Sequence, residues 1–513
     1  MAVQTPASLK ARLNLDVRVS TTVTQIDTKQ QWVVCQPVDG TAYNESYDQL
    51  ILAVGAAPLK PPIPGIDRPG LFSLRNRQDM DNIVAWMEKA KAKYSPPKMH
   101  AVVAGAGFIG FEMVEQLVAR GLDVSLVELQ KQILGPLDEE MAAFLHRDLE
   151  QRGVNVIVND AITEFAAVDD NNGSSDNLTQ VKLRSGKNLE PAHLTILGLG
   201  VRPDTDMVKA AGIECTPRGH IVVDDELRTS VPHVWAVGDS VQVKNPLLPG
   251  EMWAVPLAGP ANRQGRMVAD NIYGKHRKFK GTYATSLVRS FELYAACVGL
   301  NEKFLQMKNI PYVCVHLHAN SHAGYYPGAA QVHLKVIFDK DSGKIYGAQA
   351  VGLDGVDKRI DVVATAMQGG LLVQDLAELE LCYAPPVGSA KDPVNMAGMA
   401  AQNIMDGLVQ QIEWSQVDQY THDDNTIILD VRNPAEIARG TLSVTPNTKN
   451  IPVNDLRGRL SELPKDKHYI VTCASGQRAY YAARILMQNG YDDVSSLGGA
   501  YATFHVIHPE ELR

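Results

Sequence analysis

The sequence predicts a multidomain α/β protein in which strands and helices alternate over most of the chain. Three observations carry this prediction. A glycine-rich loop joins a strand to a helix at 105–110, a short apolar strand ends in a carboxylate at Asp239, and an apolar strand near the C-terminus ends in Cys473 directly before a helix. Alternation of this kind is typical of α/β domains.

Length and composition limit the number of domains and the class of protein. The 513 residues are too many for a single hydrophobic core, so three or four domains are expected. With 49 basic and 58 acidic residues the net charge is −9. Nucleic-acid-binding proteins are normally basic, so we expect no nucleic-acid partner. No apolar run is long enough to span a bilayer, so we expect no membrane partner either.

The cysteines indicate a reducing compartment. All six are scattered and none forms a C-x-x-C pair. This distribution favours individual thiols over a disulfide framework or a zinc site. The first twenty residues also lack the charged-then-apolar layout of a signal peptide. We therefore expect a cytoplasmic protein.

Hydrophobic periodicity and turn residues give the order of the elements. The predicted elements are strands within 16–54, a helix over 77–94, a strand–loop–helix–strand unit over 100–128, a helix over 138–152, strands within 194–203 and 213–240, a helix starting near 256, strands over 332–339 and 344–352, helices up to about 408, and a final alternating α/β unit.

The loop G-A-G-F-I-G predicts a dinucleotide site. Gly105 permits the tight turn, Gly107 lets the backbone approach a pyrophosphate, and Gly110 allows close packing of helix and strand. Glu128 ends the next strand, 23 residues after Gly105, where it can accept hydrogen bonds from a ribose. This acid favours NADH, although NADPH stays possible because Lys131 is near. The alternative is a glycine turn that serves packing alone.

Asp239 follows Gly238 at the end of the strand 234–237. A carboxylate in this place suits the hydroxyl groups of a polyol, and the alternative is an aspartate that caps the following turn.

Several motifs together resemble one family of flavoproteins. Thr229, Ala236, Gly238 and Asp239 resemble the second flavin-contact motif of flavoproteins with two dinucleotide-binding domains. The segments 47–65, 318–329 and 381–399 and the trailing small domain are similar to one branch. That branch is the coenzyme A-disulfide reductase and NADH-dependent persulfide reductase group with a fused rhodanese domain, and the resemblance covers nearly the whole chain.

The resemblance implies two nested dinucleotide-binding domains, an α+β dimerisation domain and a C-terminal rhodanese α/β domain. The implied ranges are 1–98 and 212–283 for the FAD-binding domain, 99–211 for the NAD(P)H-binding domain, 284–408 for the dimerisation domain, and 409–513 for the linker and the rhodanese-like domain.

One departure from the family concerns the start of the chain. Family members open with a second G-x-G-x-x-G loop, for the FAD pyrophosphate, followed by a redox cysteine. This sequence contains one such loop, at 105–110, and residues 1–20 resemble the family sequence just after that cysteine. We therefore expect the first βαβ unit of the FAD domain to be missing. A wrongly assigned start codon is the favoured explanation, and a truncated gene or a real loss of reductase chemistry are the others.

The resemblance also implies roles for residues of the flavin half. Asp239, with Gly238, would bind the ribityl chain of FAD. Leu257 and Ala258 open a helix whose amides can stabilise negative charge on the reduced flavin. Gly200, in the segment G-V-R-P, resembles the loop that lines the nicotinamide.

Two tyrosines are implied to reach the active site of the partner subunit and to assist a departing thiolate. Their positions here are Tyr383 and Tyr325, with Tyr326 as the alternative to the latter. A tyrosine suits this role because it stays protonated near neutral pH. The alternative is aromatic packing at a dimer seam. The family works as a homodimer through the range 284–408.

Three histidines and one cysteine are expected to have structural roles. His316, His318 and His322 are conceivable zinc ligands, because H-x-H on a strand places both rings on one face, but no cysteine or acid completes the set at familiar spacing. We therefore predict no metal site. Cys382 has no basic neighbour in the sequence, so we expect a buried, inert thiol.

Cys473 is the candidate nucleophile of the last domain. It lies between an apolar strand and a helix, where the loop amides and the positive helix end lower a thiol pKa and stabilise a thiolate or persulfide. Arg478, five residues on, adds a cation at the rim. Phosphatases place arginine six residues after the cysteine, whereas this spacing resembles the rhodanese loop. Asp430, in a second rhodanese-like motif, is expected to be structural.

These features give three hypotheses. The first is a FAD-dependent NAD(P)H reductase of coenzyme A disulfide, a persulfide or polysulfide, coupled to a rhodanese sulfur carrier. The second is a sulfurtransferase with an inactive redox scaffold, and the third is a non-enzymatic NADH-binding module. The sequence leaves open whether coenzyme A, glutathione or polysulfide is the natural partner.

Overall fold

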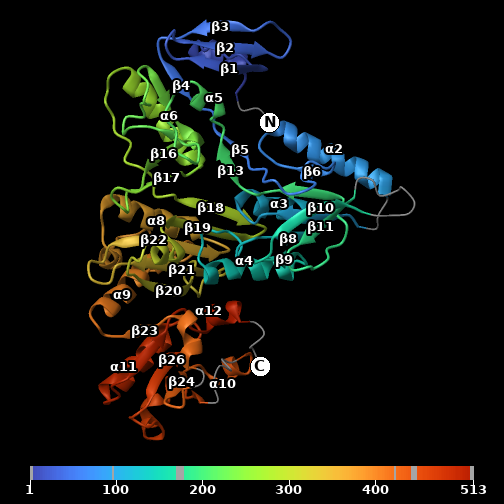
Figure 1. The fold of residues 1–513 in the computed structure, drawn as a ribbon. Coiled ribbons are helices and arrows are strands. Elements are labelled where there is room, and N and C mark those ends of the chain that lie inside the picture. The colour runs from blue at the N-terminus through green and yellow to red at the C-terminus, as the bar shows by residue number, and fades with distance from the viewer. Residues whose placement is uncertain (1–3, 95–97, 169–177, 421–422, 441–446, 509–513) are drawn as a thin grey trace. The chain divides into compact units, whose positions relative to one another are not determined.

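The computed structural model describes residues 4–94, 98–168, 178–420, 423–440 and 447–508 (Figure 1). The chain divides into two compact units, one of Met1–Leu59 with Gly200–Thr282 and one of Lys60–Leu199 with Tyr283–Arg513. The architecture is mixed α/β, as predicted. In the described part of the chain, no helix combines the length and the hydrophobicity needed to cross a membrane.

The first unit is built from small sheets around one apolar core. Its core includes Ile26, Leu52, Val234 and Val268. Strand β15 runs parallel to β4, which places the turn at Gly238 at the end of this pair. The elements are α1 (Pro6–Leu13), β1 (Thr21–Asp27), β2 (Trp32–Pro37), β3 (Tyr43–Ser46), β4 (Leu50–Leu52), β5 (Ala56–Pro58), β13 (Val201–Pro203), α5 (Asp206–Ala210), β14 (Ile221–Val222), β15 (Val234–Ala236), β16 (Val241–Lys244), β17 (Met252–Trp253) and α6 (Ala258–Ile272).

The second unit begins with a five-stranded parallel sheet in the order β6-β12-β7-β8-β9. Apolar clusters cover both faces of the sheet, so its central strands are fully buried. The elements are β6 (Leu71–Phe72), α2 (Arg77–Tyr94), β7 (His100–Ala104), α3 (Phe108–Ala119), β8 (Asp123–Val127), α4 (Glu139–Gln151), β9 (Asn155–Ile157), β10 (Ile162–Ala167), β11 (Thr179–Leu183) and β12 (Leu194–Leu197).

An antiparallel sheet follows, in the order β18-β19-β22-β21-β20. Helix α8 packs on β19 and β22, and α9 packs on β20. The elements are β18 (Ser286–Ser290), β19 (Leu293–Gly299), α7 (Glu302–Met307), β20 (Val313–Asn320), β21 (Gln331–Phe338), β22 (Ile345–Gly352), α8 (Val356–Gly369), η2 (Val373–Glu378) and α9 (Pro393–Met405).

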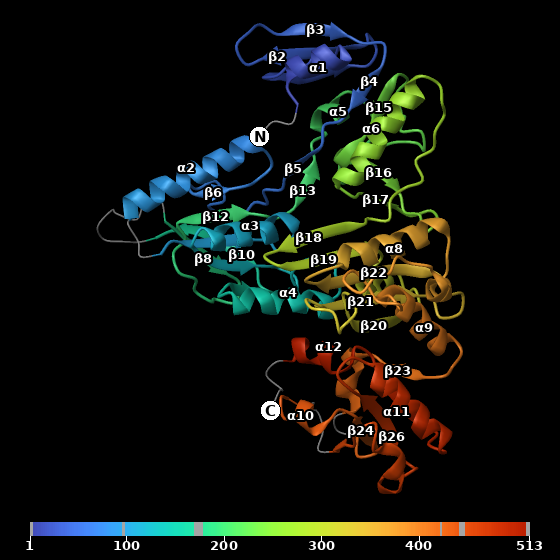
Figure 2. The same ribbon diagram turned by 180° about the vertical axis from the view of Figure 1, so that it is seen from behind.

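The last part of the second unit is a parallel sheet in the order β23-β27-β26-β24-β25, drawn in orange and red in Figure 2. Helix α11 packs on β26 and β27, and α12 packs on α4. The elements are β23 (Gln410–Ile412), η3 (Trp414–Tyr420), β24 (Thr426–Asp430), α10 (Pro434–Ile437), β25 (Thr448–Asn450), β26 (His468–Thr472), α11 (Gln477–Gln488), β27 (Val494–Leu497) and α12 (Ala500–Ile507).

Candidate active sites

The glycine loop between β7 and α3 has the geometry of a dinucleotide site. Gly105 has φ +96°, and a Cβ atom there would lie 2.3 Å from the Gly198 carbonyl oxygen. A Cβ atom at Gly110 would lie 1.9 Å from the Gly105 carbonyl oxygen. Both glycines are therefore required by packing. At Gly107 a Cβ atom would meet nothing within 4 Å, so this position leaves open space where a phosphate group can approach.

Glu128 lies directly beside this loop. Its carboxylate accepts hydrogen bonds from the Ala106 N–H at 2.7 Å and the Gln130 N–H at 2.9 Å. Helix α3 begins at Phe108 with Gly107 as its N-cap, which makes no side-chain capping bond to its amides. A bound pyrophosphate can accept from such amides. Open space, free amides and a carboxylate at the strand end together fit a dinucleotide.

The residues predicted for the flavin lie together in the first unit. Gly238 has φ +80°, donates its N–H to Gln264 Oε1 at 2.7 Å, and begins the short turn that holds the half-buried Asp239. Strand β13, which follows Gly200, lies against this turn. Helix α6 begins at Ala258 with Leu257 as an N-cap that forms no side-chain capping bond. A carboxylate and uncapped helix amides fit the ribityl chain and the electron-rich ring of a flavin.

The structure brings the two predicted tyrosines together. The hydroxyl oxygens of Tyr325 and Tyr383 are 3.3 Å apart, and both side chains are exposed. The hydrogen bond to Tyr383 raises the pKa of Tyr325, which keeps this hydroxyl protonated at neutral pH. Tyr326 packs instead against His322, with ring centroids 5.9 Å apart.

Cys382 differs from the expectation. The predicted buried thiol is exposed, because the segment around it lies outside the helices and strands that form the core. A lack of basic neighbours in the sequence carries no information about burial, so that prediction was wrong.

Cys473 occupies the loop between β26 and α11, and its side chain is buried. The Gly476 N–H donates a hydrogen bond to its sulfur at 3.1 Å. Gly476 has φ +99°, a conformation that glycine adopts without strain and that turns this amide toward the sulfur. The amide and the start of α11 together stabilise negative charge on the sulfur.

Arg478 is fixed by an acid on α10. Its guanidinium donates two hydrogen bonds of 2.7 Å to the two carboxylate oxygens of Glu436. These bonds lower the pKa of Glu436 to about 2. The hydrogen bonds to Glu436 also raise the pKa of Arg478, and the charge of Cys473 makes a smaller contribution in the same direction. Sequence reasoning identified the arginine but missed its partner.

Asp430 takes part in a buried ion pair. It accepts from the Arg432 guanidinium at 2.7 Å, and the guanidinium carbon of Arg432 lies 3.9 Å from the ring centre of Tyr501. Tyr501 in turn donates its N–H to the Cys473 carbonyl oxygen at 3.0 Å. This arrangement agrees with the structural role expected for Asp430.

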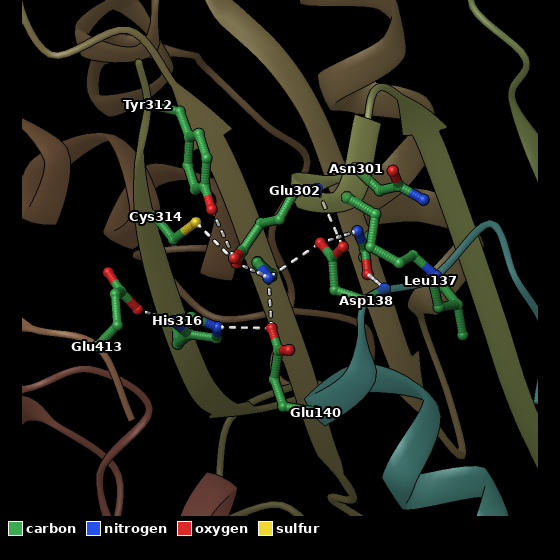
Figure 3. A network of polar contacts seen from close by, with 12 residues as sticks. Leu137, Asp138, Glu140, Asn301, Glu302, Tyr312, Cys314, His316 and Glu413 are labelled. Atoms are coloured by element: carbon green, nitrogen blue, oxygen red, sulfur yellow. Dashed lines mark hydrogen bonds and ion pairs between the residues drawn. The ribbon is translucent and has the colours of Figure 1, made fainter. Parts of the chain in front are cut away.

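A network of buried charges lies outside the predicted site residues (Figure 3). The Lys335 ammonium on β21 contacts carboxylates of Asp138, Glu140 and Glu302. Burial raises the pKa of Glu140, but Lys335 and His316 outweigh this effect and hold it below its usual range. The three carboxylates lie close enough together to hold a metal ion. The lysine already neutralises charge at their centre, so the network is a structural ion cluster.

The three histidines considered as zinc ligands have separate partners. His316 Nε2 lies 3.0 Å from Glu140, and His318 Nδ1 lies 2.7 Å from His333 Nδ1. His318 Nε2 lies 2.9 Å from the Gly499 carbonyl oxygen. His322 Nδ1 lies 3.2 Å from the Ala323 carbonyl oxygen. The ring nitrogens therefore bond to three different regions of the second unit.

Comparison with known protein families assigns three segments. Residues 3–265 match the pyridine nucleotide-disulphide oxidoreductase family, residues 286–393 match the dimerisation domain of pyridine nucleotide-disulphide oxidoreductases, and residues 413–506 match the rhodanese-like domain.

Individual proteins resemble the chain over most of its length. It is 33% identical to the NADH oxidase of Methanocaldococcus jannaschii, over 77% of this chain and 84% of that protein. It is also 33% identical to the coenzyme A disulfide reductase of Staphylococcus haemolyticus, over 78% and 86%.

Two solved structures match nearly the whole of this chain. The reduced CoADR-RHD of Bacillus anthracis has a TM-score of 0.92 at 44% identity and covers 99% of this chain and 88% of its own. The NAD-dependent persulfide reductase of A. fulgidus has a TM-score of 0.89 at 33% identity, with coverage of 98% and 88%. The chain therefore belongs to the pyridine nucleotide-disulphide oxidoreductases, a family of enzymes that use FAD and NAD(P)H, and it carries a rhodanese-like domain at 413–506.

Proposed function

We propose that this protein uses NAD(P)H and FAD to reduce a sulfur–sulfur bond in a coenzyme A disulfide, a persulfide or a polysulfide, and that Cys473 carries the sulfur. One observation carries the proposal: a single chain joins an oxidoreductase of the disulphide-reducing family to a rhodanese-like thiol loop. The similarity to a coenzyme A disulfide reductase and to a persulfide reductase supports it.

NADH is the proposed reductant. Its pyrophosphate would occupy the open space at Gly107, and Glu128 would accept hydrogen bonds from the adenosine ribose. The carboxylate of Glu128 would repel the 2′-phosphate of NADPH, so NADPH would be the poorer substrate.

The flavin would be held by the first unit. Asp239, with Gly238, would bind the ribityl hydroxyls, the amides after Leu257 and Ala258 would face the electron-rich ring, and Gly200 would line the nicotinamide. Bound FAD would supply the two-electron chemistry between the nicotinamide and the sulfur substrate.

Tyr325 and Tyr383 would assist the thiolate that leaves when the sulfur–sulfur bond breaks. In their mutual hydrogen bond one hydroxyl donates to the other, which leaves the proton of the accepting hydroxyl available to the thiolate. We propose that they act on the partner subunit within a homodimer formed through 284–408, the range that contains the dimerisation match.

The rhodanese-like loop would hold sulfane sulfur. The Cys473 thiolate would attack the terminal sulfur of a persulfide R–S–SH, breaking the sulfur–sulfur bond and releasing R–S⁻ while Cys473 becomes a persulfide. The Gly476 amide and Arg478 would stabilise the negative charge on both sides of this exchange. The alternative of a sulfurtransferase with an inactive scaffold is not favoured, because reductases match the chain well beyond the rhodanese-like segment.

Two assays test the proposal. The first follows NADH oxidation and sulfide release with coenzyme A persulfide as substrate. The second follows the transfer of sulfur from thiosulfate to cyanide. Cys473→Ser should abolish sulfur transfer yet leave NADH-driven reduction of coenzyme A disulfide, while Cys215→Ser serves as the matched control. If NADH is not consumed with any of these sulfur substrates, the reductase proposal fails. If Cys473→Ser retains sulfur transfer, the carrier role fails.

A further inference from the structure

The two segments that carry the tyrosine pair are irregular. Tyr325 lies in the loop 321–330 and Tyr383 lies in the segment 379–392, and neither range contains a helix or a strand. Both side chains are exposed, so packing of the rings contributes little to holding their hydroxyl oxygens 3.3 Å apart. The positions of the two hydroxyls therefore depend on the bonds that hold the two segments.

One buried arginine bonds to both segments. Arg359, on α8, is 1% exposed. Its Nη2 atom donates a hydrogen bond of 2.7 Å to the carbonyl oxygen of Ser321, the first residue of the Tyr325 loop. The same guanidinium donates to both carboxylate oxygens of Asp392, at 3.2 and 2.9 Å, at the end of the Tyr383 segment. Because the guanidinium is planar and holds its acceptors in fixed directions, Arg359 fixes the two segments relative to each other.

The surroundings of Arg359 hold its guanidinium in one orientation. Its Nη1 atom donates to the Gly355 carbonyl oxygen at 3.1 Å, so each of its three nitrogens has an acceptor. A Cβ atom at Gly355 would lie 2.1 Å from Nη1, so the glycine leaves room for the guanidinium. The buried Asp392 also caps α9 by accepting the Val394 N–H at 3.1 Å. Both partners of this ion pair are therefore anchored to helices.

Main-chain bonds extend this constraint toward the tyrosines. The Ala323 N–H donates to the Gly388 carbonyl oxygen at 2.8 Å, which joins the two segments a second time. Ala323 lies two positions before Tyr325. The Gly388 N–H donates to the carbonyl oxygen of Ala384 at 3.1 Å, and Ala384 directly follows Tyr383. Each tyrosine therefore lies within two positions of a residue in this bonded group.

We propose that Arg359 is a positioning residue for the tyrosine pair and holds both hydroxyls where the leaving thiolate forms. The inference rests on the proposed role of Tyr325 and Tyr383 in the reduction. Arg359 acts through the two segments, because its own side chain is buried. Misplacement of a reacting group by about 1 Å can cost roughly a hundredfold in rate, so a small shift of either segment slows the reduction. The effect falls on kcat, because the hydroxyls act when the sulfur–sulfur bond breaks.

Arg359→Lys tests the proposal in the full chain loaded with FAD. Lysine keeps the positive charge but lacks the planar fork that reaches both segments. For NADH-driven reduction of coenzyme A disulfide, kcat should fall about tenfold while KM changes less than about twofold. Sulfur transfer from thiosulfate to cyanide should also change less than about twofold, because Cys473 does not use the tyrosines. Arg289→Lys, at an exposed position of β18, is the matched control.

A second measurement does not depend on turnover. The hydrogen bond to Tyr383 raises the pKa of Tyr325, so 3-fluorotyrosine at position 325 reports this contact in a fluorine NMR titration. In the otherwise wild-type chain, Tyr383→Phe should lower the midpoint of that titration. In the Arg359→Lys chain, the same substitution should produce less than half of this shift, because the two hydroxyls are already separated.

Asp392→Asn protects the test against misfolding. Asparagine still caps a helix but bonds the Arg359 guanidinium more weakly, so this variant should reproduce both the loss of kcat and the smaller fluorine shift. An unchanged kcat or an unchanged fluorine shift in Arg359→Lys overturns the positioning role, and so does an equal loss of thiosulfate transfer. If the wild-type chain reduces no sulfur substrate, the proposed function fails, and the fluorine titration still decides whether Arg359 places the tyrosines.

Discussion

The hydroxyl oxygens of Tyr325 and Tyr383 lie 3.3 Å apart, although 58 positions separate the two residues in the chain. The pair is exposed and joins two irregular segments, so packing does not explain its geometry. Two phenol donors held at one place are suited to stabilise a developing thiolate.

Tyr383→Phe should lower NADH-driven disulfide reduction by about a hundredfold, because it removes one donor to the leaving thiolate. Tyr325→Phe should have a similar effect, and the double variant should lose little more, since the two hydroxyls act as a unit. Thiosulfate-to-cyanide transfer should be unchanged in all three. Tyr326→Phe is the control, and an equal loss of reduction in that variant would contradict the assignment.

Glu436→Gln should lower sulfur transfer by Cys473 about tenfold, equivalent to about 1.4 kcal/mol. The substitution removes the charged partner that orients the Arg478 guanidinium. Because the pKa of Glu436 is about 2, the wild-type pair stays ionised throughout the working pH range, so wild-type transfer should show no titration from this group above pH 4. Glu462→Gln, which affects an exposed pair with Arg459, is the control. Equal rates in both variants would show that Arg478 needs no fixed partner.

Gly107→Ala should weaken NADH binding without affecting stability, whereas Gly110→Ala should lower the stability of the protein. A methyl group at Gly107 fills open space, so stability should change by less than about 0.5 kcal/mol while the Kd for NADH rises about tenfold. A methyl group at Gly110 meets the Gly105 carbonyl oxygen and should destabilise the protein by about 1–3 kcal/mol. Thermal unfolding and NADH titration measure the two effects. Unchanged NADH affinity in Gly107→Ala would exclude this loop as the pyrophosphate site.

Lys335→Met should lower the free energy of unfolding by about 3–5 kcal/mol, because it leaves buried carboxylates without their cation. The fully buried ammonium contacts Asp138, Glu140 and Glu302. Urea unfolding measures the change, and Lys340→Met, on an exposed turn, should stay within about 0.5 kcal/mol. A loss below about 1 kcal/mol would mean that the carboxylates take up protons and need no lysine.

Local patterns in the sequence predicted the strand–loop–helix units that carry the candidate site residues. Residues that are close in the sequence form these units, so their spacing is enough to predict them. The units are the glycine loop 105–110 with Glu128 at the end of the next strand, and the strand and helix on either side of Cys473. The helix expected over 77–94 is α2 with the same bounds. The boundaries of the four domains stay predictions. Strand β6 belongs to the parallel sheet of the second unit, and Ile83 and Met87 of α2 pack in the apolar cluster beside that sheet.

The sequence did not predict the contacts between residues that are far apart in the chain. The acids that contact Lys335 are Asp138, Glu140 and Glu302, and no rule of sequence spacing connects Glu302 or Lys335 with the first two. The one available signal was a lysine at the centre of the apolar strand β21, where both neighbours on the strand are buried.

The most direct measurement of the central claim is an anaerobic NADH titration of the purified protein after incubation with FAD. Stoichiometric flavin binding followed by loss of the visible flavin absorbance is the expected result, with much weaker bleaching by NADPH. A protein that binds FAD but keeps its absorbance in excess NADH, or that binds no FAD at all, would contradict the account.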